Sequence, residues 1–476
     1  MTLEETAKEY LTRLINRSLV QVEWSDSTGR ARSCRAHDLI HEVLLSKLEE
    51  LNLIQSSQAN SNGGARYLWI DNNRACDLRR RNGNCQTHSI IFFNLQELHA
   101  NMFERLSINF KLLRELDFEN APLEYIPEEI GNLWHLRYLS LRNSKVRMLP
   151  KSLGKLHNLL TLDLKGSLVV EISDEVRGLC NLQYLVAYSV DHDNRYNINT
   201  DQGIRINGSV IGSLESLEKL YYADFQSQNG EHFGRELRRL KRLRKLGITK
   251  LKSDCGEALC DAIRQMHHLH ALRISAVKED EVLELESLSP PPSLHRIRLH
   301  GISDDSLKIL GDLPKLLEVW LHEGYNGVEL HFEQGRFQKL KFLALRCLYK
   351  LEKLVIDRGS LPCLENLLMG PSPLLQEVPN NICNLNSLRT LVFQDMKGIR
   401  QKDYASDCQV SFVNGKFRKD PKHLRAEDSF LGINMPGNMS NQLGSVVTPV
   451  NDEHVPVLLP TLLAYLGLEF TMHLLD

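Results

Sequence analysis

The 476-residue sequence has no excess of charge of either sign and no long uninterrupted apolar run. Its 58 Lys and Arg nearly balance its 60 Asp and Glu, so the composition gives no reason to expect nucleic acid or an anionic membrane as a partner. Residues 1–10 are rich in charge and lack an apolar core, which excludes a secretory signal there and predicts a cytoplasmic protein. The apolar stretch 455–475 is interrupted by two prolines, Glu469 and His473, so no membrane span is predicted.

Motifs of catalysis and of nucleotide or metal binding are also missing. No G-x-x-x-x-G-K-S/T loop is present, and residues 154–156 (Gly-Lys-Leu) lack the leading glycine and the hydroxyl, so this chain alone is not expected to bind or hydrolyse nucleotide. The ten cysteines include no C-x-x-C pair and are expected to be free thiols. His267, His268 and His270 flank Leu269, a predicted core position, without a Cys or carboxylate to complete a site. Neither a metal site nor an enzyme is therefore predicted.

What the sequence does contain is a repeated leucine pattern, which residues 133–150 show clearly. Leu136, Leu139 and Leu141 occupy positions 1, 4 and 6 of this unit, and Val146 occupies position 11. This spacing is typical of a leucine-rich repeat, in which the leucines of a short strand face the core and the residues between them face outward. The sequence therefore predicts an α/β fold in which the units stack into a leucine-rich-repeat solenoid, or horseshoe.

The repeat array is predicted to fill residues 67–400 with about fourteen units. Successive position-4 residues are 22 to 26 residues apart, except for 35 residues between Leu185 and Leu220. The long gap contains the polar segment 189–203, for which we expect an exposed loop. Residues 401–476 are predicted to form an irregular tail outside the array. The position-4 residues are Leu68, Ile90, Leu116, Leu139, Leu162, Leu185, Leu220, Leu246, Leu272, Ile297, Val319, Leu343, Leu367 and Leu391.

A small module precedes the repeats. Residues 2–18 show helical spacing of apolar residues, strand-like segments follow at 18–24 and 31–36 with a turn between them, and a second helix comes next. Helix, two-stranded hairpin and helix is the layout of a winged-helix domain, which is predicted for residues 1–51 and followed by a polar linker at 52–66. Because its first helix has no basic stripe, DNA binding is not predicted.

Two segments of this module resemble a known family. Residues 10–21 (YLTRLINRSLVQ) and 34–47 (CRAHDLIHEVLLSK) are similar to the end of the nucleotide-binding region of plant intracellular disease-resistance proteins of the coiled-coil class, in which leucine-rich repeats follow. The resemblance implies that Ala36, His37 and Asp38 occupy the Met-His-Asp position of that family. Ala36 departs from the motif, whereas His37 and Asp38 are kept.

The resemblance also implies a function. In the intact family the histidine contacts the phosphates of bound ADP and holds the receptor inactive, so His37 and Asp38 would bind ADP or ATP only in an intact receptor. This chain, without a P-loop, resembles the carboxy-terminal part and is expected to hold no cofactor. The implied role is recognition and autoinhibition in a receptor that senses pathogen effectors or guarded host proteins, with the nucleotide-binding domain as a further partner. The alternative is a stand-alone leucine-rich-repeat adaptor, or a truncated decoy without nucleotide switching.

One part of the array is predicted to bind a partner. Outward-facing residues of neighbouring strands lie about 4.8 Å apart on the concave face, so they form rows. Three successive units place Trp320 and Phe342 beside charged and histidine side chains, which is the composition of a binding hot spot. The alternative is that Trp320 and Phe342 cover one another or face the receptor's own domains. The predicted contact residues are Arg296, Arg298, His300, Glu318, Trp320, His322, Phe342 and Arg346.

Two other groups carry weaker predictions. Tyr138, Tyr184 and Tyr188 form a second outward-facing group on the array. The basic run 235–245 is either a solvated face or a surface that attracts acidic residues of the nucleotide-binding domain.

Overall fold

The structure is a computed structural model of the chain. It divides into two compact units, Met1–Leu68 with Arg418–Asp476 and Trp69–Phe417, and each is described by itself. The described residues are 3–25, 31–36, 43, 46–47, 50, 65–70, 86–92, 95–97, 102–187, 203–224, 230–277, 283, 285, 287–300, 304–323, 325–377, 380–396 and 409–413.

The first unit contains a helix followed by a hairpin. Helix α1 (Leu3–Asn16) precedes β1 (Val20–Ser25) and β2 (Ala31–Ala36), which pair antiparallel. The apolar residues of α1 recur at helical spacing, and Leu11 and Leu14 on this face are buried. The helix and both strands agree with the ranges predicted from the sequence.

The remainder of the predicted winged helix is described only at single positions. Residues 43, 46, 47 and 50 are helical, in agreement with a second helix. His37 and Asp38, the linker segment 52–64 and the apolar stretch 455–475 lie outside the described residues. Within the described ranges, no helix is both long and apolar enough to cross a membrane.

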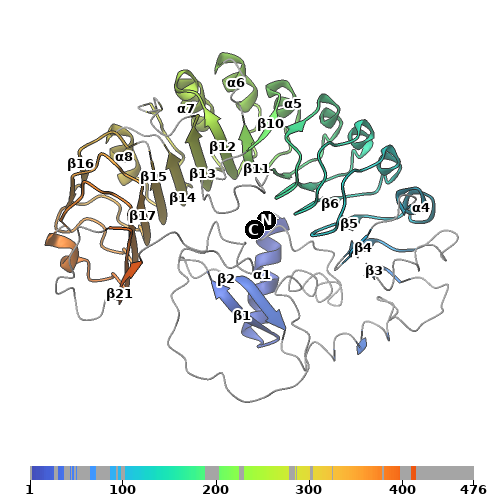
Figure 1. Ribbon diagram of the computed structural model, residues 1–476, viewed down its shortest axis with the longest axis horizontal. Coiled ribbons are helices and arrows are strands. Elements are labelled where there is room, and N and C mark those ends of the chain that lie inside the picture. Colours follow the sequence, from blue (N-terminus) through green and yellow to red (C-terminus); the bar gives the residue numbers. More distant parts are fainter. Residues whose placement is uncertain are drawn as a thin grey trace. The chain divides into compact units, whose positions relative to one another are not determined.

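The second unit is built on a parallel sheet whose strands follow one another along an arc (Figure 1). From Ile90 to Leu391, each predicted position-4 residue lies opposite that of the next unit, as Leu139 does between Leu116 and Leu162. The apolar periodicity therefore predicted the strand register. The strands are β3 (Tyr67–Ile70), β4 (Ser89–Phe92), β5 (Glu115–Asp117), β6 (Tyr138–Ser140), β7 (Thr161–Asp163), β9 (Tyr184–Val186), β11 (Lys219–Asp224), β12 (Lys245–Leu251), β13 (Ala271–Ala276), β14 (Arg296–His300), β15 (Glu318–His322), β17 (Phe342–Arg346), β19 (Asn366–Met369) and β20 (Thr390–Gln394).

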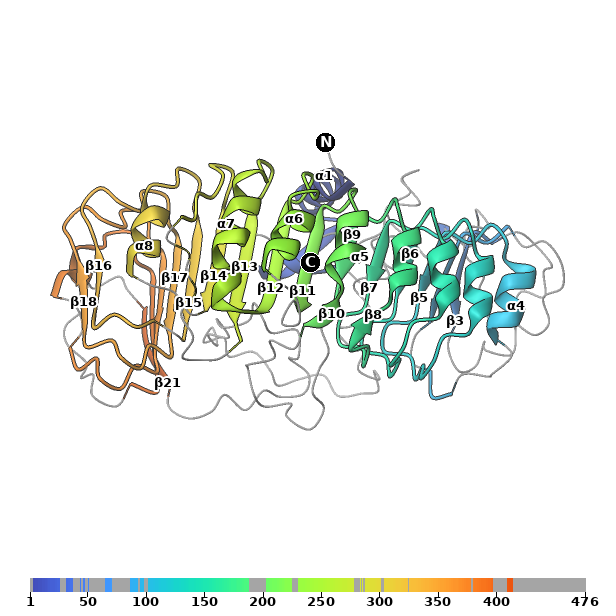
Figure 2. The same cartoon turned by 90° about the horizontal axis from the view of Figure 1, so that it is seen from above.

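Helices and short strands form the convex side of this unit, opposite the sheet (Figure 2). Several units have only a 3-10 turn there. In η2 (Lys151–Lys155) the next unit approaches so closely that a Cβ on Gly154 would lie 2.1 Å from the carbonyl oxygen of Glu175. Glycine is therefore required at that position. The elements are α4 (Met102–Asn109), η1 (Glu128–Asn132), η2 (Lys151–Lys155), η3 (Asp174–Gly178), α5 (Gly208–Ser213), α6 (Gly230–Leu237), η5 (Ser253–Cys255), α7 (Gly256–Arg264), α8 (Asp304–Gly311), η6 (Asn380–Asn384) and the separate strand pair β16 (Glu329–Phe332) and β18 (Lys353–Ile356).

The loop expected at 189–203 lies outside the described residues, apart from Gly203. The rest of the long gap before β11 contains regular structure, because β10 (Ile204–Ile206) pairs in parallel with β8 (Glu171–Ile172) and β11, and α5 follows it. The structure departs from the predicted array in one place. The predicted end of the array at residue 400 is wrong by one strand, since β21 (Gln409–Val413) pairs in parallel with β20 and places Val410 opposite Leu391. The segment carries no leucine at the marker position, but it satisfies the open hydrogen-bonding edge of β20.

The continuous core predicts a clear effect for one leucine. Leu139→Ala is expected to lower the free energy of unfolding by about 3 kcal/mol, because Leu139 is fully buried against the position-4 residues of both neighbouring units. Urea unfolding and limited proteolysis measure this. The control is Met148→Ala in the same unit, where the side chain is 79% exposed. Equal unfolding midpoints and equal protease resistance of Leu139→Ala and the parent would contradict the prediction.

Candidate recognition surface on the concave face

The predicted contact residues lie on β14, β15 and β17, three neighbouring parallel strands. Arg296 lies opposite Glu318, which lies opposite Phe342, and Arg298 lies opposite Trp320. Side chains alternate along a strand, so these residues share one face of the sheet and the leucines between them share the other. The strand register thus brings the predicted set together in adjacent rows.

Glu318 is the centre of this group, although its carboxylate is almost fully buried. Nε of Arg296 lies 3.0 Å from its Oε2, and Nη2 of Arg298 lies 3.4 Å from its Oε1. The indole Nε1 of Trp320 donates to the same Oε1 at 2.5 Å. One buried carboxylate therefore holds two guanidinium groups and an indole through charge-assisted hydrogen bonds and ion pairs.

Aromatic stacking adds to this arrangement. The guanidinium of Arg298 lies over the Trp320 ring, 4.7 Å from its centroid, and Trp320 stacks on Phe342 with centroids 4.8 Å apart. Phe342 is 2% exposed, so its predicted exposure is wrong: it packs beneath Trp320, as the alternative interpretation allowed. Trp320 itself is half-buried.

Arg346 is likewise buried, which was not expected of a contact residue. Burial lowers the pKa of its guanidinium, and the nearby Glu323 carboxylate acts in the opposite direction. Its Nη2 donates to Oε1 of Gln394 at 3.4 Å. Of the eight predicted contact residues, those that remain half-buried are Arg296, Arg298, His300, Trp320 and His322.

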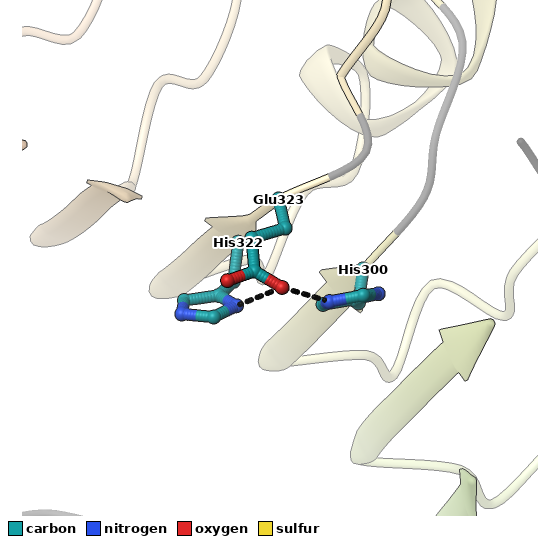
Figure 3. Close-up of side chains that lie close together, drawn as sticks. All are labelled: His300, His322 and Glu323. Atoms are coloured by element: carbon teal, nitrogen blue, oxygen red, sulfur yellow. Dashed lines mark hydrogen bonds and ion pairs between the residues drawn. The ribbon is translucent and has the colours of Figure 1, made fainter. Parts of the chain in front are cut away.

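A residue that the sequence analysis missed completes a second group. Nε2 of His300 lies 2.7 Å from Oε2 of Glu323, and Nδ1 of His322 lies 3.8 Å from the same oxygen (Figure 3). The two imidazole rings stack with centroids 5.6 Å apart. The sequence carried one indication of this group, which is that a carboxylate residue directly follows His322 in the unit after that of His300.

Tyr138 and Tyr184, two of the three tyrosines of the weaker prediction, are buried. Burial raises the pKa of Tyr138 well above its ordinary value, and the nearby carboxylates, of which Asp117 contributes most, act in the same direction. The hydroxyl of Tyr184 donates to Oε2 of Glu218 at 3.2 Å. Tyr188 lies outside the described residues.

The basic run and the histidines near Leu269 have local partners. Nη2 of Arg239, within the run, lies 2.8 Å from Oε1 of Glu215 in the preceding unit, so part of its charge is already balanced. His267 and His268 are exposed, and Nδ1 of His270 lies 3.0 Å from the carbonyl oxygen of Ser293. The proposed attraction of the run to a nucleotide-binding domain stays a hypothesis.

Comparisons with known proteins agree with both parts of this structure. Residues 1–44 match the family described as "Disease resistance protein Winged helix domain", and residues 86–306 match "Leucine-rich repeat region". A solved leucine-rich-repeat protein from Leptospira interrogans is similar with a TM-score of 0.41 and 19% identity, covering 77% of this chain and 98% of that chain. The fold and the two family matches together define a leucine-rich-repeat protein with an amino-terminal winged helix, as predicted.

Particular relatives extend this result. The chain is 29% identical to Disease resistance protein RPM1 of Arabidopsis thaliana, covering 82% of this chain and 44% of that protein. It is 26% identical to Disease resistance protein RPP8 of the same plant, covering 83% and 46%. The chain is therefore homologous to plant disease resistance proteins over most of its length, which confirms the resemblance, and it spans less than half the length of these relatives.

The contacts of Glu318 predict that its carboxylate stabilises this surface. Glu318→Gln is expected to lower the free energy of unfolding by roughly 1–3 kcal/mol, because the two arginines lose the charge that pairs them. Urea unfolding measures the effect, with Glu352→Gln at an exposed position as the control. A Glu318→Gln protein as stable as the control would show that the carboxylate does not hold the surface.

Proposed function

We propose that this chain is the recognition and autoinhibitory portion of a plant intracellular immune receptor that acts in the cytoplasm. The observation that carries the proposal is homology to disease resistance proteins over 82% of the chain, together with the family matches to the winged helix at 1–44 and the repeats at 86–306. The chain spans 44% of the length of RPM1, so homology alone does not assign it the activity of a whole receptor. That activity belongs to the proposal.

The surface around Trp320 is the proposed contact for a pathogen effector or a guarded host protein. Trp and Arg are common among residues that dominate binding energy. Here the indole of Trp320 and the guanidinium of Arg298 are both fixed by Glu318 before any partner arrives. Prior fixation reduces the side-chain entropy lost on binding, so this surface suits tight recognition.

Recognition would act by shifting a population of receptor states. A partner that binds the active state better than the inactive one moves the balance toward activity, and a shift from 1:99 to 99:1 needs a difference of about 5.5 kcal/mol. His37 and Asp38 would contact ADP or ATP in the intact receptor. The P-loop that would hold the phosphates is not in this sequence, so the proposed role of this chain is binding.

A second candidate function is a stand-alone leucine-rich-repeat adaptor, or a decoy that binds a partner without nucleotide switching. The repeat array supports it, because such an array offers a binding surface by itself. The two functions differ in whether the chain associates with a nucleotide-binding half.

Co-expression separates these functions. The 476-residue chain, expressed in leaves with the P-loop-containing half of a homologous disease resistance protein, is expected to co-precipitate with it and to suppress its cell-death signalling. His37→Ala or Asp38→Ala is expected to release that suppression. Absence of co-precipitation would overturn the receptor proposal and favour the adaptor.

The recognition surface has its own test in a chimeric receptor. The repeats of this chain replace those of the receptor that supplies the nucleotide-binding half, effectors are screened for one that triggers cell death through this chimera, and the assay measures that response. Trp320→Ala is expected to reduce the response at least tenfold, because the ring organises the patch. Trp134→Ala is the matched control, since Trp134 is 61% exposed and lies outside the β14–β17 group. Equal responses of the two variants would contradict this placement of the surface.

A further inference from the structure

We propose that His300, His322 and Glu323 form a binding site for one transition-metal dication of the Zn²⁺ class. Within the part of the chain that the structure describes, this is the group of three or more His, Cys, Asp or Glu residues whose ligand atoms come together, all within 4.8 Å of one another. Two imidazole nitrogens and one carboxylate oxygen are a ligand set that Zn²⁺ uses in proteins. The inference is independent of the proposed immune function, because metal binding needs no partner.

The distances suit a metal ion. Ligand atoms about 2.0–2.1 Å from a tetrahedral Zn²⁺ lie roughly 3.3–3.4 Å from one another. The two nitrogen–oxygen separations to Oε2 of Glu323, 2.7 Å from His300 and 3.8 Å from His322, lie on either side of that value. Figure 3 shows both rings directing a nitrogen toward this oxygen, so small side-chain rotations would place all three atoms around one ion.

The backbone explains why neighbouring residues can share this site. Consecutive residues of a strand point to opposite faces, so His322 and Glu323 would ordinarily diverge. His322 ends β15, and Glu323 then takes a left-handed conformation with φ 51°. Its backbone N–H donates to the carbonyl oxygen of Arg346 at 3.0 Å, which fixes this turn to the next unit. The carboxylate is therefore held beside the histidines by the fold.

Burial further distinguishes this group from surface histidines. The side chains of His300 and Glu323 are 12% and 6% exposed, so their ligand atoms are largely removed from water. The side chain of His322 is 24% exposed, and we expect the fourth coordination position on its side. Three protein ligands with one open position is the arrangement of zinc sites that accept water or a further ligand.

Two features limit the expected affinity. Metal binding through Nε2 moves the ring proton of His300 to Nδ1, which is buried and has no hydrogen-bond partner among the described residues. A hydrogen-bond partner for the ring nitrogen that does not bind the metal typically raises metal affinity by about 10–100-fold, and His300 gains no such increase. Arg346 lies opposite His322 on β17, and its positive charge opposes a second cation. We therefore expect dissociation constants in the micromolar range.

Calorimetric titration of the chelator-treated, reduced 476-residue chain with ZnCl₂ tests the site. The parent is expected to bind one Zn²⁺ with micromolar affinity, and Glu323→Gln and His322→Ala are expected to weaken binding at least tenfold. His267→Ala/His268→Ala, which removes two exposed histidines, is the control and should bind as the parent does. Circular dichroism confirms that the variants fold. If Glu323→Gln does not fold, His322→Ala, at the most exposed ligand, carries the test.

Titration with CoCl₂ identifies the ligands independently. Tetrahedral cobalt with nitrogen and oxygen ligands is expected to give visible absorption without a thiolate charge-transfer band, and this absorption should disappear in Glu323→Gln. Absence of saturable Zn²⁺ binding would overturn the proposal. So would parent-like binding by both ligand variants, loss of binding in the exposed-histidine control, or a thiolate band that accounts for all bound cobalt.

Discussion

The second unit depends on one constraint, which is that each repeat hydrogen-bonds to the next in the same parallel register. The amide groups of Arg137 and Tyr138 both donate to the carbonyl oxygen of Arg114, and those of Leu160 and Thr161 both donate to Arg137 in turn. Because this contact recurs from unit to unit, a residue's place within its own repeat determines its neighbours in the adjoining repeats. Core and concave face are consequently set by the same register: position-4 residues stack inward, and the residues on either side of them stack in outward rows.

This constraint also explains why charged side chains on the concave face are buried. Rows spaced by the strand separation bring carboxylates and guanidinium groups from adjacent units into contact, as with Arg142, which lies 3.8 Å from Glu119 and 3.9 Å from Asp163. A charge in such a row must be compensated by its neighbours, because the crowded face leaves it little water. The described part of the concave face therefore contains separate groups of ion pairs that span adjacent units, and the group around Glu318 holds the half-buried Trp320.

The sequence was sufficient wherever regular periodicity decided the structure. The spacing of leucines predicted the register from Ile90 to Leu391, and the register placed Arg298 beside Trp320. The sequence was insufficient where the local backbone conformation or side-chain packing determined the position of a residue. Glu323 could not be placed, since its position depends on a left-handed residue that ends the strand. Residues four places after the marker adopt this conformation in several units, with φ of 50° to 70°. Asn120, Asn143, Gly166 and Asp395 are of the types that favour it, whereas Lys250, Glu323 and Cys347 are not, so residue type did not indicate it at Glu323. The burial of Phe342 depended on which side chain stacked above it.

Glu318 and Glu323 show that the same scaffold can give two carboxylates different roles. Glu318 faces two guanidinium groups, which stay protonated at any physiological pH, so its pairing is permanent and suits a fixed surface. Glu323 faces two imidazole rings, and imidazole nitrogens and carboxylate oxygens are both common ligands of metal ions. The two groups lie on the same neighbouring strands, β14 and β15, one at the beginning of the rows and the other at their end. A metal ion bound at the Glu323 group would lie at the end of the same rows that begin with the Glu318 group. The concave face would then combine a rigid contact surface with a site whose occupancy depends on the metal ion.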